Sequence, residues 1–293
     1  MQILLFGKNG QVGKAILPLL QPIGDVVSFG HQELDVADAD HLRTVLRMYK
    51  PDVVVNASAY TNVDRAEIEK DMAWRVNAEA PGIMMEELNQ WQGTLVHIST
   101  DYVFDGTKDH PYAEDDLANP INEYGRSKLA GEEQITAKGD RYLILRTGWV
   151  YAEDSQNFVT NVFKWATAQD TLRIVDDQIG SPTWATMLAE QIASLLSRRM
   201  IPDFIEERWG IYHCSGKGAV SRYALAKKLL CLIPSRIKVK ASAVIPAKSS
   251  DFPSLASRPR YSALDCTKFE KTFDVSLPTW DLSLSNALEQ IRF

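Results

Sequence analysis

Residues 2–13, QILLFGKNGQVG, decide the fold of this 293-residue chain. Gln2–Phe6 is an apolar run typical of a β-strand, and a turn with the spacing GxxGxxG follows at Gly7, Gly10 and Gly13. Glycine permits the tight turn and lets the backbone approach a pyrophosphate closely. The helix that begins after the turn offers unpaired N–H groups to phosphates. A purely structural strand–helix connection has the same pattern, but its position after a first strand favours dinucleotide binding.

Apolar runs alternate with helical patterns over the first half of the chain. This alternation predicts an α/β fold with a doubly wound, Rossmann-like parallel sheet covered by helices on both faces. Ligands of such folds bind outside the carboxyl ends of the strands. Further strands are expected at Asp25–Phe29, Asp52–Ser58, Thr94–Thr100 and Tyr142–Arg146, and helices at Gln11–Leu20, Asp40–Tyr49, Asp71–Trp91 and Glu123–Lys138.

The pattern changes after about residue 150, which divides the chain into two predicted parts. We expect residues 1–150 to form a dinucleotide-binding Rossmann domain. Residues 151–293 are expected to form mainly a smaller substrate-binding lobe, and a return of some of its segments to the sheet stays open. Helices are expected there at 157–168, 186–196 and 221–232, and an ordered loop at 247–261.

Composition excludes several classes of protein. The net charge of −6 argues against a nucleic-acid or anionic-membrane partner. Three widely spaced cysteines give no disulfide framework and suit a reducing compartment. The chain has neither an apolar run of about 18 residues, which a membrane span needs, nor a signal peptide at its start. We therefore expect a cytoplasmic protein with no membrane partner.

A tyrosine and a lysine four residues apart indicate proton chemistry. Tyr124 and Lys128 lie at the start of a predicted helix, where positions i and i+4 share one face. A nearby ammonium lowers the pKa of a phenol, so the tyrosine can donate a proton to a carbonyl oxygen. Thr100 ends the fourth predicted strand, where its hydroxyl can bind the same carbonyl or cap its own backbone. The glycine turn, Thr100 and Tyr124/Lys128, in this order, are expected to converge on one cleft.

The choice of cofactor stays open on the sequence. A dinucleotide site usually has a carboxylate at the end of the second strand, but Ser28–His31 supplies neither an acid nor an arginine there. Asp35 and Val36 follow slightly later, and we expect them either to contact the adenine or to form a helix cap in a solvated loop. The expected cofactor is NADPH or NADH.

With these motifs the chain resembles the dTDP-4-dehydrorhamnose reductase family of extended short-chain dehydrogenase/reductases. The resemblance covers nearly the whole length, and STDYVFDG (99–106) with YGRSKLAGE (124–132) and RTGWVYA (146–152) is its most specific part. It implies NAD(P)H-dependent reduction of the C4 keto group of dTDP-6-deoxy-L-lyxo-4-hexulose to dTDP-L-rhamnose. Tyr124 would be the general acid, Lys128 its pKa partner and Thr100 the carbonyl-orienting hydroxyl.

The resemblance also implies binding residues. For the cofactor these are Gly10, Gln11 and Val12 at the pyrophosphate, Asp35 and Val36 near the adenosine, and Ala59, Tyr60 and Thr61 beside it. For the sugar nucleotide they are Asp101, Val103 and Trp149, although Trp149 would equally suit core packing. A pyrophosphate in the substrate needs cations, and Arg258 and Arg260 are the candidates. We assign no metal: Glu190 and Glu289 match glutamates that bridge some dimers of the family, but solvated helix charges explain them better.

Two kinds of alternative remain open. The same tyrosine–lysine pair serves other nucleotide-sugar reductases, epimerases and dehydratases, and Asp101 beside Thr100 suits a dehydratase. A non-catalytic dinucleotide-binding regulatory subunit is the alternative from another class. A homodimer is an open expectation.

Overall fold

The computed structural model describes residues 1–198, 208–233 and 238–290 of the chain. Its centre is a six-stranded sheet with the order β10-β5-β4-β3-β1-β2, in which every pairing is parallel. The strands are β1 (Gln2–Phe6), β2 (Asp25–Phe29), β3 (Val53–Asn56), β4 (Thr94–Thr100), β5 (Tyr142–Thr147) and β10 (Gly210–His213). The predicted doubly wound parallel sheet is thus confirmed.

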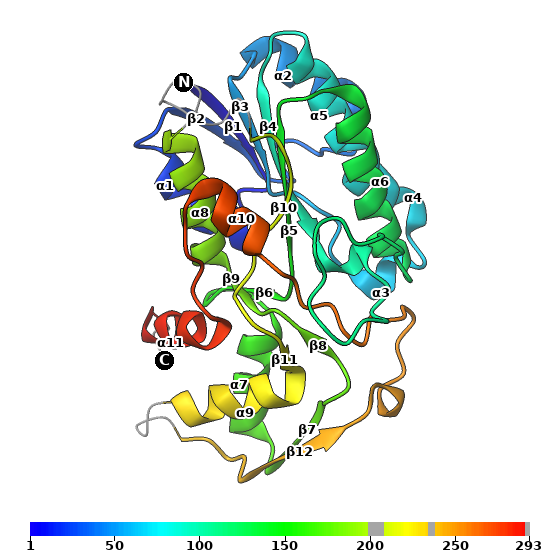
Figure 1. Ribbon diagram of the computed structural model, residues 1–293, viewed down its shortest axis with the longest axis vertical. Helices are drawn as coiled ribbons and strands as arrows, with labels where there is room; N and C mark the ends of the chain where they lie inside the picture. Colours follow the sequence, from blue (N-terminus) through cyan, green and yellow to red (C-terminus); the bar gives the residue numbers. More distant parts are fainter. Residues whose placement is uncertain (199–207, 234–237, 291–293) are drawn as a thin grey trace.

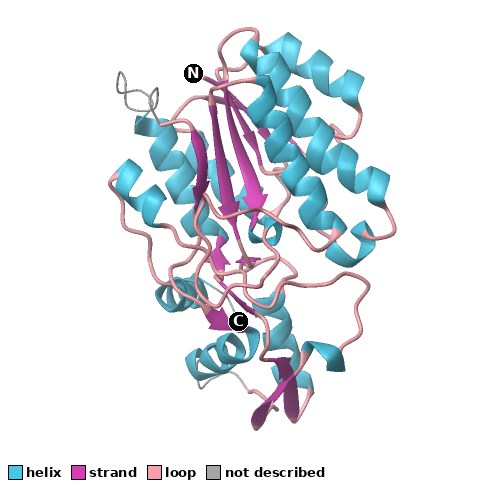
Figure 2. Cartoon of the chain, turned by 45° about the vertical axis from the view of Figure 1, so that its right-hand side comes forward, coloured by secondary structure: helices cyan, strands magenta, loops and turns pink. Residues whose placement is uncertain are grey.

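The strand order reverses between β1 and β3. The chain runs from β1 outward to β2 and then crosses back to β3 on the other side of β1. In a doubly wound sheet this reversal opens a crevice at the carboxyl ends of the strands. Figure 2 shows the arrowheads of the sheet directed at the smaller lobe, so the crevice lies between the sheet and that lobe.

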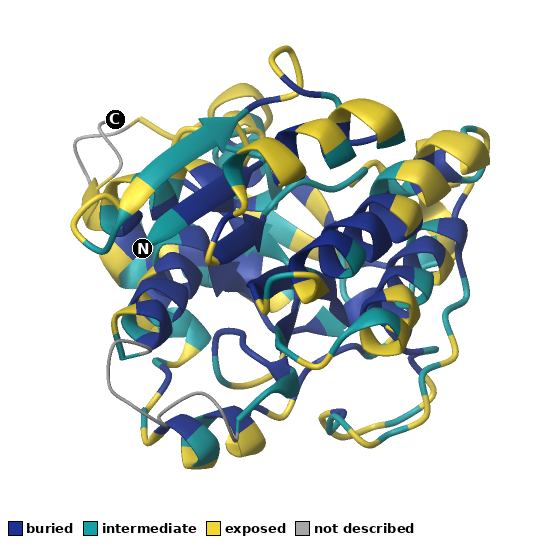
Figure 3. Cartoon of the chain, turned by 90° about the horizontal axis from the view of Figure 1, so that it is seen from above, coloured by how far each residue is buried: buried dark blue, intermediate teal, exposed yellow. Residues whose placement is uncertain are grey.

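Helices cover both faces of the sheet. On one face α1 (Gln11–Leu20) packs against α8 (Ala185–Arg198), and on the other α5 (Ala80–Asn89) packs against α2 (Ala39–Tyr49) and α6 (Glu123–Lys138). Because both faces are covered, the inner strands β1, β3, β4 and β5 are buried along most of their length, whereas the edge strand β2 is only partly buried (Figure 3). Pro18 lies inside α1 without ending it.

The helix expected over Asp71–Trp91 is divided into three parts. It consists of α4 (Lys70–Trp74), the π-helix η1 (Arg75–Glu79) and α5, and the short helix α3 (Val63–Ala66) precedes them. The π-helical turn lies against α6. The expected helix is therefore real, but it is not a regular α-helix along its whole length.

The chain after residue 150 is shared between two places. β10 is a strand of the sheet, and α8 packs with α1 on one face of the sheet. α10 (Thr267–Phe273) packs on β10. The smaller lobe lies below the sheet in Figure 1. Its elements are α7 (Phe158–Ala168), β7 (Thr171–Val175), β8 (Ile179–Gly180), β11 (Val220–Ser221), α9 (Arg222–Leu232), β12 (Ala243–Ala247) and η3 (Ser249–Asp251). β6 (Val150–Tyr151) and β9 (Thr183–Trp184) pair between the sheet and this lobe, and α11 (Trp280–Gln290) lies beside them.

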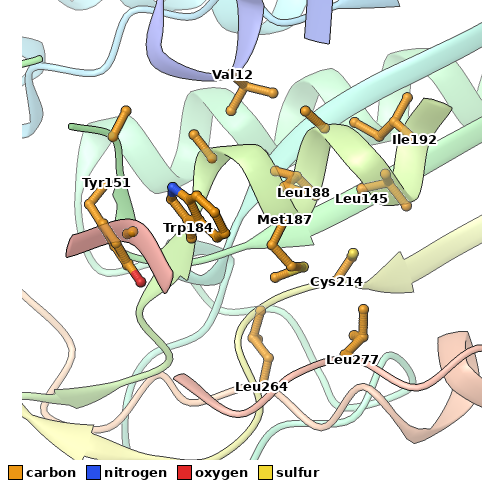
Figure 4. Close-up of a cluster of buried hydrophobic side chains, with 14 of the residues drawn as sticks. Val12, Leu145, Tyr151, Trp184, Met187, Leu188, Ile192, Cys214, Leu264 and Leu277 are labelled. Carbon is orange, nitrogen blue, oxygen red and sulfur yellow. The ribbon is translucent and has the colours of Figure 1, made fainter. Parts of the chain in front are cut away.

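A large hydrophobic core joins the sheet to α8. Figure 4 shows Leu145 of β5 facing Met187, Leu188 and Ile192 of α8, with Val12 of α1 nearby. Burial of such side chains contributes about 1.5–3 kcal/mol each, so this face of the sheet is firmly closed. All three cysteines are free. In the described ranges we find no helix with the length and apolarity that a membrane crossing requires.

Candidate active site

The glycine turn passes under the ends of β1 and β3. Gly7 has a φ of 84°, and a Cβ there would lie 2.6 Å from the backbone of Ala57. A Cβ on Gly13 would lie 2.0 Å from the carbonyl oxygen of Gly7, so this glycine lets α1 begin close to the strand. Both positions therefore require glycine, and the turn stays open toward the crevice at Gly10.

An outer cavity of about 420 Å³ opens on one side of the turn. It gathers residues from β1, from the segment after β2 and from the segment after β3, which are adjacent because of the strand order. The predicted binding residues Gly7, Gly10, Asp35, Val36, Ala59 and Tyr60 all line it. Asp35 also accepts a hydrogen bond from Ala37 N at 3.0 Å, but the cap of α2 is Asp38, so the alternative that Asp35 caps this helix is wrong.

An inner cavity of about 480 Å³ adjoins the outer one and shares Gly10 and Ala59 with it. The structure brings ten predicted residues together here: Gly10, Gln11, Val12, Ala59, Thr61, Thr100, Asp101, Tyr124, Lys128 and Trp149. The expected convergence of the glycine turn, Thr100 and the tyrosine–lysine pair is therefore present. Three predicted residues line neither of these cavities: Gly13 packs in the turn, Val103 is fully buried in the core, and Arg258 lines a third cavity.

Local contacts fix the start of α6, which carries Tyr124 and Lys128. Asn122 caps the helix by accepting from Gly125 N at 2.8 Å, and its own amide donates to Ser257 O at 2.8 Å. A Cβ on Gly125 would lie 2.2 Å from the carbonyl oxygen of Tyr102, so only glycine allows this close approach. The helix is thereby pressed against the end of β4, where Thr100 lies.

Burial dominates the electrostatics of Tyr124. It raises the pKa of the phenol above its ordinary value, and a hydrogen bond with the Thr100 hydroxyl opposes this by a smaller amount. The sequence predicted a lowered pKa caused by Lys128, and the structure contradicts that prediction. The lysine Nζ lies 2.6 Å from Ile98 O and 3.0 Å from His97 Nε2, so it points to β4. Burial lowers the pKa of Lys128 to about 8.

Asp101 is a buried carboxyl beside Thr100. It accepts hydrogen bonds from Ser262 Oγ at 2.5 Å and from Thr100 Oγ1 at 3.1 Å. Burial raises the pKa of Asp101 to about 6. The Thr100 hydroxyl also accepts from Tyr102 N at 3.2 Å, so the backbone-capping role of Thr100 exists together with its place in the cavity.

A third cavity, of about 590 Å³, lies in the smaller lobe and contains two arginines. The guanidinium carbon of Arg222 lies 4.0 Å from the ring centroid of Trp149, and its Nε donates to Gln178 Oε1 at 3.1 Å. Arg258 also lines this cavity and donates to Asp64 at 2.7 Å, whereas Arg260 is not part of the lining. Cationic and aromatic side chains thus meet next to the inner cavity.

Comparison with known proteins decides the family. The family model described as the RmlD substrate binding domain matches residues 1–293. The chain is 37% identical over 287 residues to the dTDP-4-dehydrorhamnose reductase of Burkholderia thailandensis, covering 96% of this chain and 95% of the relative. The chain belongs to the dTDP-4-dehydrorhamnose reductase family.

Solved structures of dTDP-4-dehydrorhamnose reductases agree with this assignment. The Clostridium acetobutylicum protein has a TM-score of 0.91 at 33% identity, with both chains fully covered. The Bacillus anthracis protein, solved in complex with NADP, has a TM-score of 0.89 at 31% identity, with 99% of each chain covered. The predicted family and its oxidoreductase class are confirmed.

Sequence reasoning missed several polar residues of this reductase fold. Arg222 begins α9, where a cation is unfavourable for the helix dipole, and this placement was the available signal. His97 stands inside an otherwise apolar strand, TLVHIST, which was a second signal. Glu33 supplies a carboxylate near the place where the second strand lacks one, because it accepts from Gly30 N at 2.7 Å and from Lys8 Nζ at 2.6 Å.

Proposed function

We propose that this protein catalyses the NAD(P)H-dependent reduction of dTDP-4-dehydro-6-deoxy-L-mannose to dTDP-L-rhamnose at its C4 keto group. The observation that carries the proposal is the meeting of Thr100, Tyr124 and Lys128 in one cavity beside the glycine turn. Relatives that are more than 30% identical over nearly the whole chain bear the name of this reductase.

The two adjoining cavities suit NADPH or NADH. Gln11 and Val12 offer backbone N–H groups at the start of α1, which suit a pyrophosphate, and Gly10 lets it approach closely. Asp35, Val36 and Tyr60 line the outer cavity, where an adenosine fits. Lys128 and Tyr124 lie in the inner cavity, so a nicotinamide end belongs there. The Bacillus anthracis relative, which has NADP, supports this choice of cofactor.

Tyr124 is the proposed proton donor. Because burial raises its pKa, the phenol stays protonated at neutral pH and holds the proton that the C4 oxygen needs. Thr100 orients the carbonyl with its hydroxyl. Lys128, when it is an ammonium, stabilises the phenolate of Tyr124. A bound reduced nicotinamide supplies the hydride. Asp101 and Trp149 complete the wall against which the sugar lies.

The smaller lobe is the proposed substrate lobe, and it is built from segments that follow residue 150. Arg222 and Arg258 supply guanidinium groups, which bind phosphate oxygens bidentately, in a chain whose net charge is −6. Phe158 and Phe252 line the same cavity and offer apolar faces to a base. Arg222 is thus a second candidate phosphate-binding residue beside the predicted Arg258.

Tyr124→Phe tests the function. With the keto sugar nucleotide and reduced cofactor, we expect one equivalent of NAD(P)H consumed per dTDP-L-rhamnose formed. We expect turnover to fall at least about 100-fold in Tyr124→Phe, because the proton donor is gone, while cofactor binding is kept. Tyr142→Phe, on β5 outside the cavities, is the matched control and should keep full turnover.

Two results would contradict the proposal. Conversion of the keto sugar nucleotide to another product without net NAD(P)H consumption would indicate an epimerase or a dehydratase, because those enzymes regenerate their cofactor. Tight cofactor binding with no sugar-dependent NAD(P)H oxidation would indicate the regulatory subunit.

A further inference from the structure

A chain of three buried polar groups runs behind the inner cavity. Asn56 of β3 and His97 of β4 are register partners in the sheet, and Asn56 Nδ2 lies 3.1 Å from His97 Nδ1. His97 Nε2 in turn lies 3.0 Å from Lys128 Nζ. The exposed fractions of the three side chains are 0%, 0% and 1%, so water does not supply the missing hydrogen-bond partners. The three groups must therefore satisfy their hydrogen bonds with one another and with neighbouring protein groups.

Ser58 fixes the orientation of the Asn56 amide. Asn56 Oδ1 accepts from Ser58 N at 3.1 Å and from Ser58 Oγ at 2.6 Å. A backbone N–H only donates, so the atom that faces it has to be the amide oxygen. The amide nitrogen, which donates, therefore faces His97.

The orientation of Asn56 decides the tautomer of His97. Because Asn56 Nδ2 donates to it, Nδ1 of the imidazole carries a lone pair and no hydrogen. Burial lowers the pKa of His97 well below its usual value, so the ring is neutral and its one hydrogen lies on Nε2. That hydrogen points at Lys128 Nζ.

The tautomer of His97 in turn decides the state of Lys128. An ammonium group has three hydrogens and no lone pair, so it cannot accept from Nε2–H. The arrangement is satisfied when Lys128 is a neutral amine that accepts from His97 and donates to Ile98 O at 2.6 Å. A charged Lys128 requires His97 to move its hydrogen to Nδ1, which breaks the bond with Asn56.

We propose that His97 is a positioning residue that donates its Nε2 hydrogen to the lone pair of Lys128 and, held by Asn56, sets how readily this lysine takes up a proton. The inference rests on the proposed function for its catalytic meaning. After Tyr124 has given its proton to the substrate, an ammonium on Lys128 returns one to the phenolate, and the amine regains its proton from solvent. A lysine that gives and takes protons with equal ease near the working pH serves this exchange best.

Other titratable and charged groups lie around this lysine. Glu132 is on the same helix, Tyr124 and Asp101 line the same cavity, and Arg146 of β5 pairs with Glu132. Glu132 raises the pKa of Lys128, but its carboxylate is held by Arg146 at 2.7 Å and by Ser99 Oγ at 2.5 Å. These groups stay in place when residue 97 or residue 56 is replaced, so a change in the behaviour of Lys128 in such variants reports on His97.

The first test observes the tautomer itself and needs no activity. Nitrogen NMR of cofactor-free protein carrying ¹⁵N-labelled histidine separates the protonated from the bare ring nitrogen, and His97→Asn identifies the signals among the five histidines. We expect hydrogen on Nε2 and none on Nδ1 above about pH 8, where Lys128 is a neutral amine because its pKa is about 8. In Asn56→Asp, whose carboxylate only accepts, the hydrogen should move to Nδ1. Hydrogen on Nδ1 in the wild-type protein at a pH where Lys128 is neutral would overturn the proposal, whatever reaction the protein catalyses.

The second test uses the pH dependence of kcat/KM in the reductase assay. Loss of kcat/KM at high pH is expected to follow the deprotonation of Lys128, whose pKa is about 8. His97→Gln presents an amide oxygen to the lysine and favours the ammonium, so the decline should move upward by about one pH unit or more. His97→Asn keeps an acceptor for Asn56 but withdraws the Nε2 hydrogen, so it should move the decline in the same direction.

A purely structural role for His97 gives a different result. In that case the variants lower the free energy of unfolding while the pH at which kcat/KM declines stays unchanged, and that outcome overturns the proposal. If the residue 97 variants do not fold, Asn56→Asp provides the same upward shift without altering His97.

Discussion

At the scale of single residues, Asp101 couples the active site to the stability of the fold. Its pKa is about 6 in the folded chain, against the ordinary 3.8, because the carboxyl is buried. A raised folded pKa means that the protonated form is favoured in the fold, so stability is highest at low pH. As the pH rises from about 4 to about 6, unfolded chains lose the proton first and the folded state loses stability.

Asp101→Asn removes this penalty and keeps oxygen or nitrogen partners for Ser262 and Thr100. The variant should match the wild type near pH 4 and exceed it in free energy of unfolding by up to about 3 kcal/mol near pH 8. Urea unfolding at the two pH values measures this difference. Asp25→Asn, at an exposed carboxylate, is the control and should show no such pH-dependent gain. A difference between Asp101→Asn and the wild type that is the same at both pH values would contradict the coupling.

Sequence reasoning identified the residues that we propose to react, but not the residues behind them. Tyr124, Lys128 and Thr100 were found because their spacing relates directly to strand ends and helix faces. The direction in which Lys128 points was not predictable, because it depends on a hydrogen count through His97 and Asn56. Arg222 was missed because the contact that places it, the Trp149 ring, comes from a distant part of the chain.

At the scale of elements, a close contact with the π-helix η1 positions α6, the helix that carries the proposed proton donor Tyr124. A Cβ on Gly131 of α6 would lie 2.1 Å from the carbonyl oxygen of Asn77 in η1. Asn77 donates to Ser127 Oγ at 3.0 Å and to Tyr60 O at 3.1 Å, so it ties this contact to the wall of the outer cavity. The glycine is what lets the two helices approach.

Gly131→Ala is expected to destabilise the protein although alanine is the better helix former. Helix propensity favours alanine by about 1 kcal/mol, whereas the overlap with Asn77 forces a backbone shift that typically costs about 1–3 kcal/mol. We therefore expect a net loss of about 1 kcal/mol in the free energy of unfolding. Thermal and urea unfolding measure the change, and Glu133→Ala on the exposed face of α6 should leave stability nearly unaltered. An alanine variant as stable as the wild type would show that the two helices can separate freely.

The same contact explains why the boundaries within Asp71–Trp91 were wrong. The apolar spacing correctly predicted a helix there, since α4, η1 and α5 follow one another without a break. The π-helical turn brings the buried Asn77 side chain between Tyr60 and Ser127, which are far away in the sequence. Local propensity contains no information on such a tertiary contact.

At the scale of the whole molecule, the strand–helix alternation was enough to predict the sheet. It does not predict which segments of the second half of the chain join the sheet and which form the smaller lobe. β10 is a strand of the sheet and α8 packs beside α1 on one of its faces, although both lie beyond residue 150. β10 has four residues and begins after a stretch with no strong apolar run, so it gains its place by pairing with β5. Tertiary pairing, not local pattern, decides where such a short strand goes.

The loop predicted at 247–261 is the main connection across the crevice from the smaller lobe to the sheet. Asp64 of α3 accepts from Ala256 N at 3.0 Å and binds the Arg258 guanidinium at 2.7 Å. These contacts hold the loop beside the cavity that contains Arg222. Because one carboxylate makes several of them, removing it should free the loop without disturbing either lobe.

Asp64→Ala is therefore expected to raise the rate of limited proteolysis between residues 252 and 258 and to raise KM for the sugar nucleotide by about tenfold, the effect of roughly 1.4 kcal/mol of lost binding energy. The kcat should change much less, since Tyr124 and Lys128 stay in place on α6. Asp170→Ala, which removes the exposed partner of Lys240 in the smaller lobe, should alter neither measurement. Because the Asp64 contacts exist without substrate, equal proteolysis of Asp64→Ala and wild type would show that other contacts hold the loop. An unchanged KM together with faster proteolysis would instead show that an ordered loop is not needed to bind the substrate.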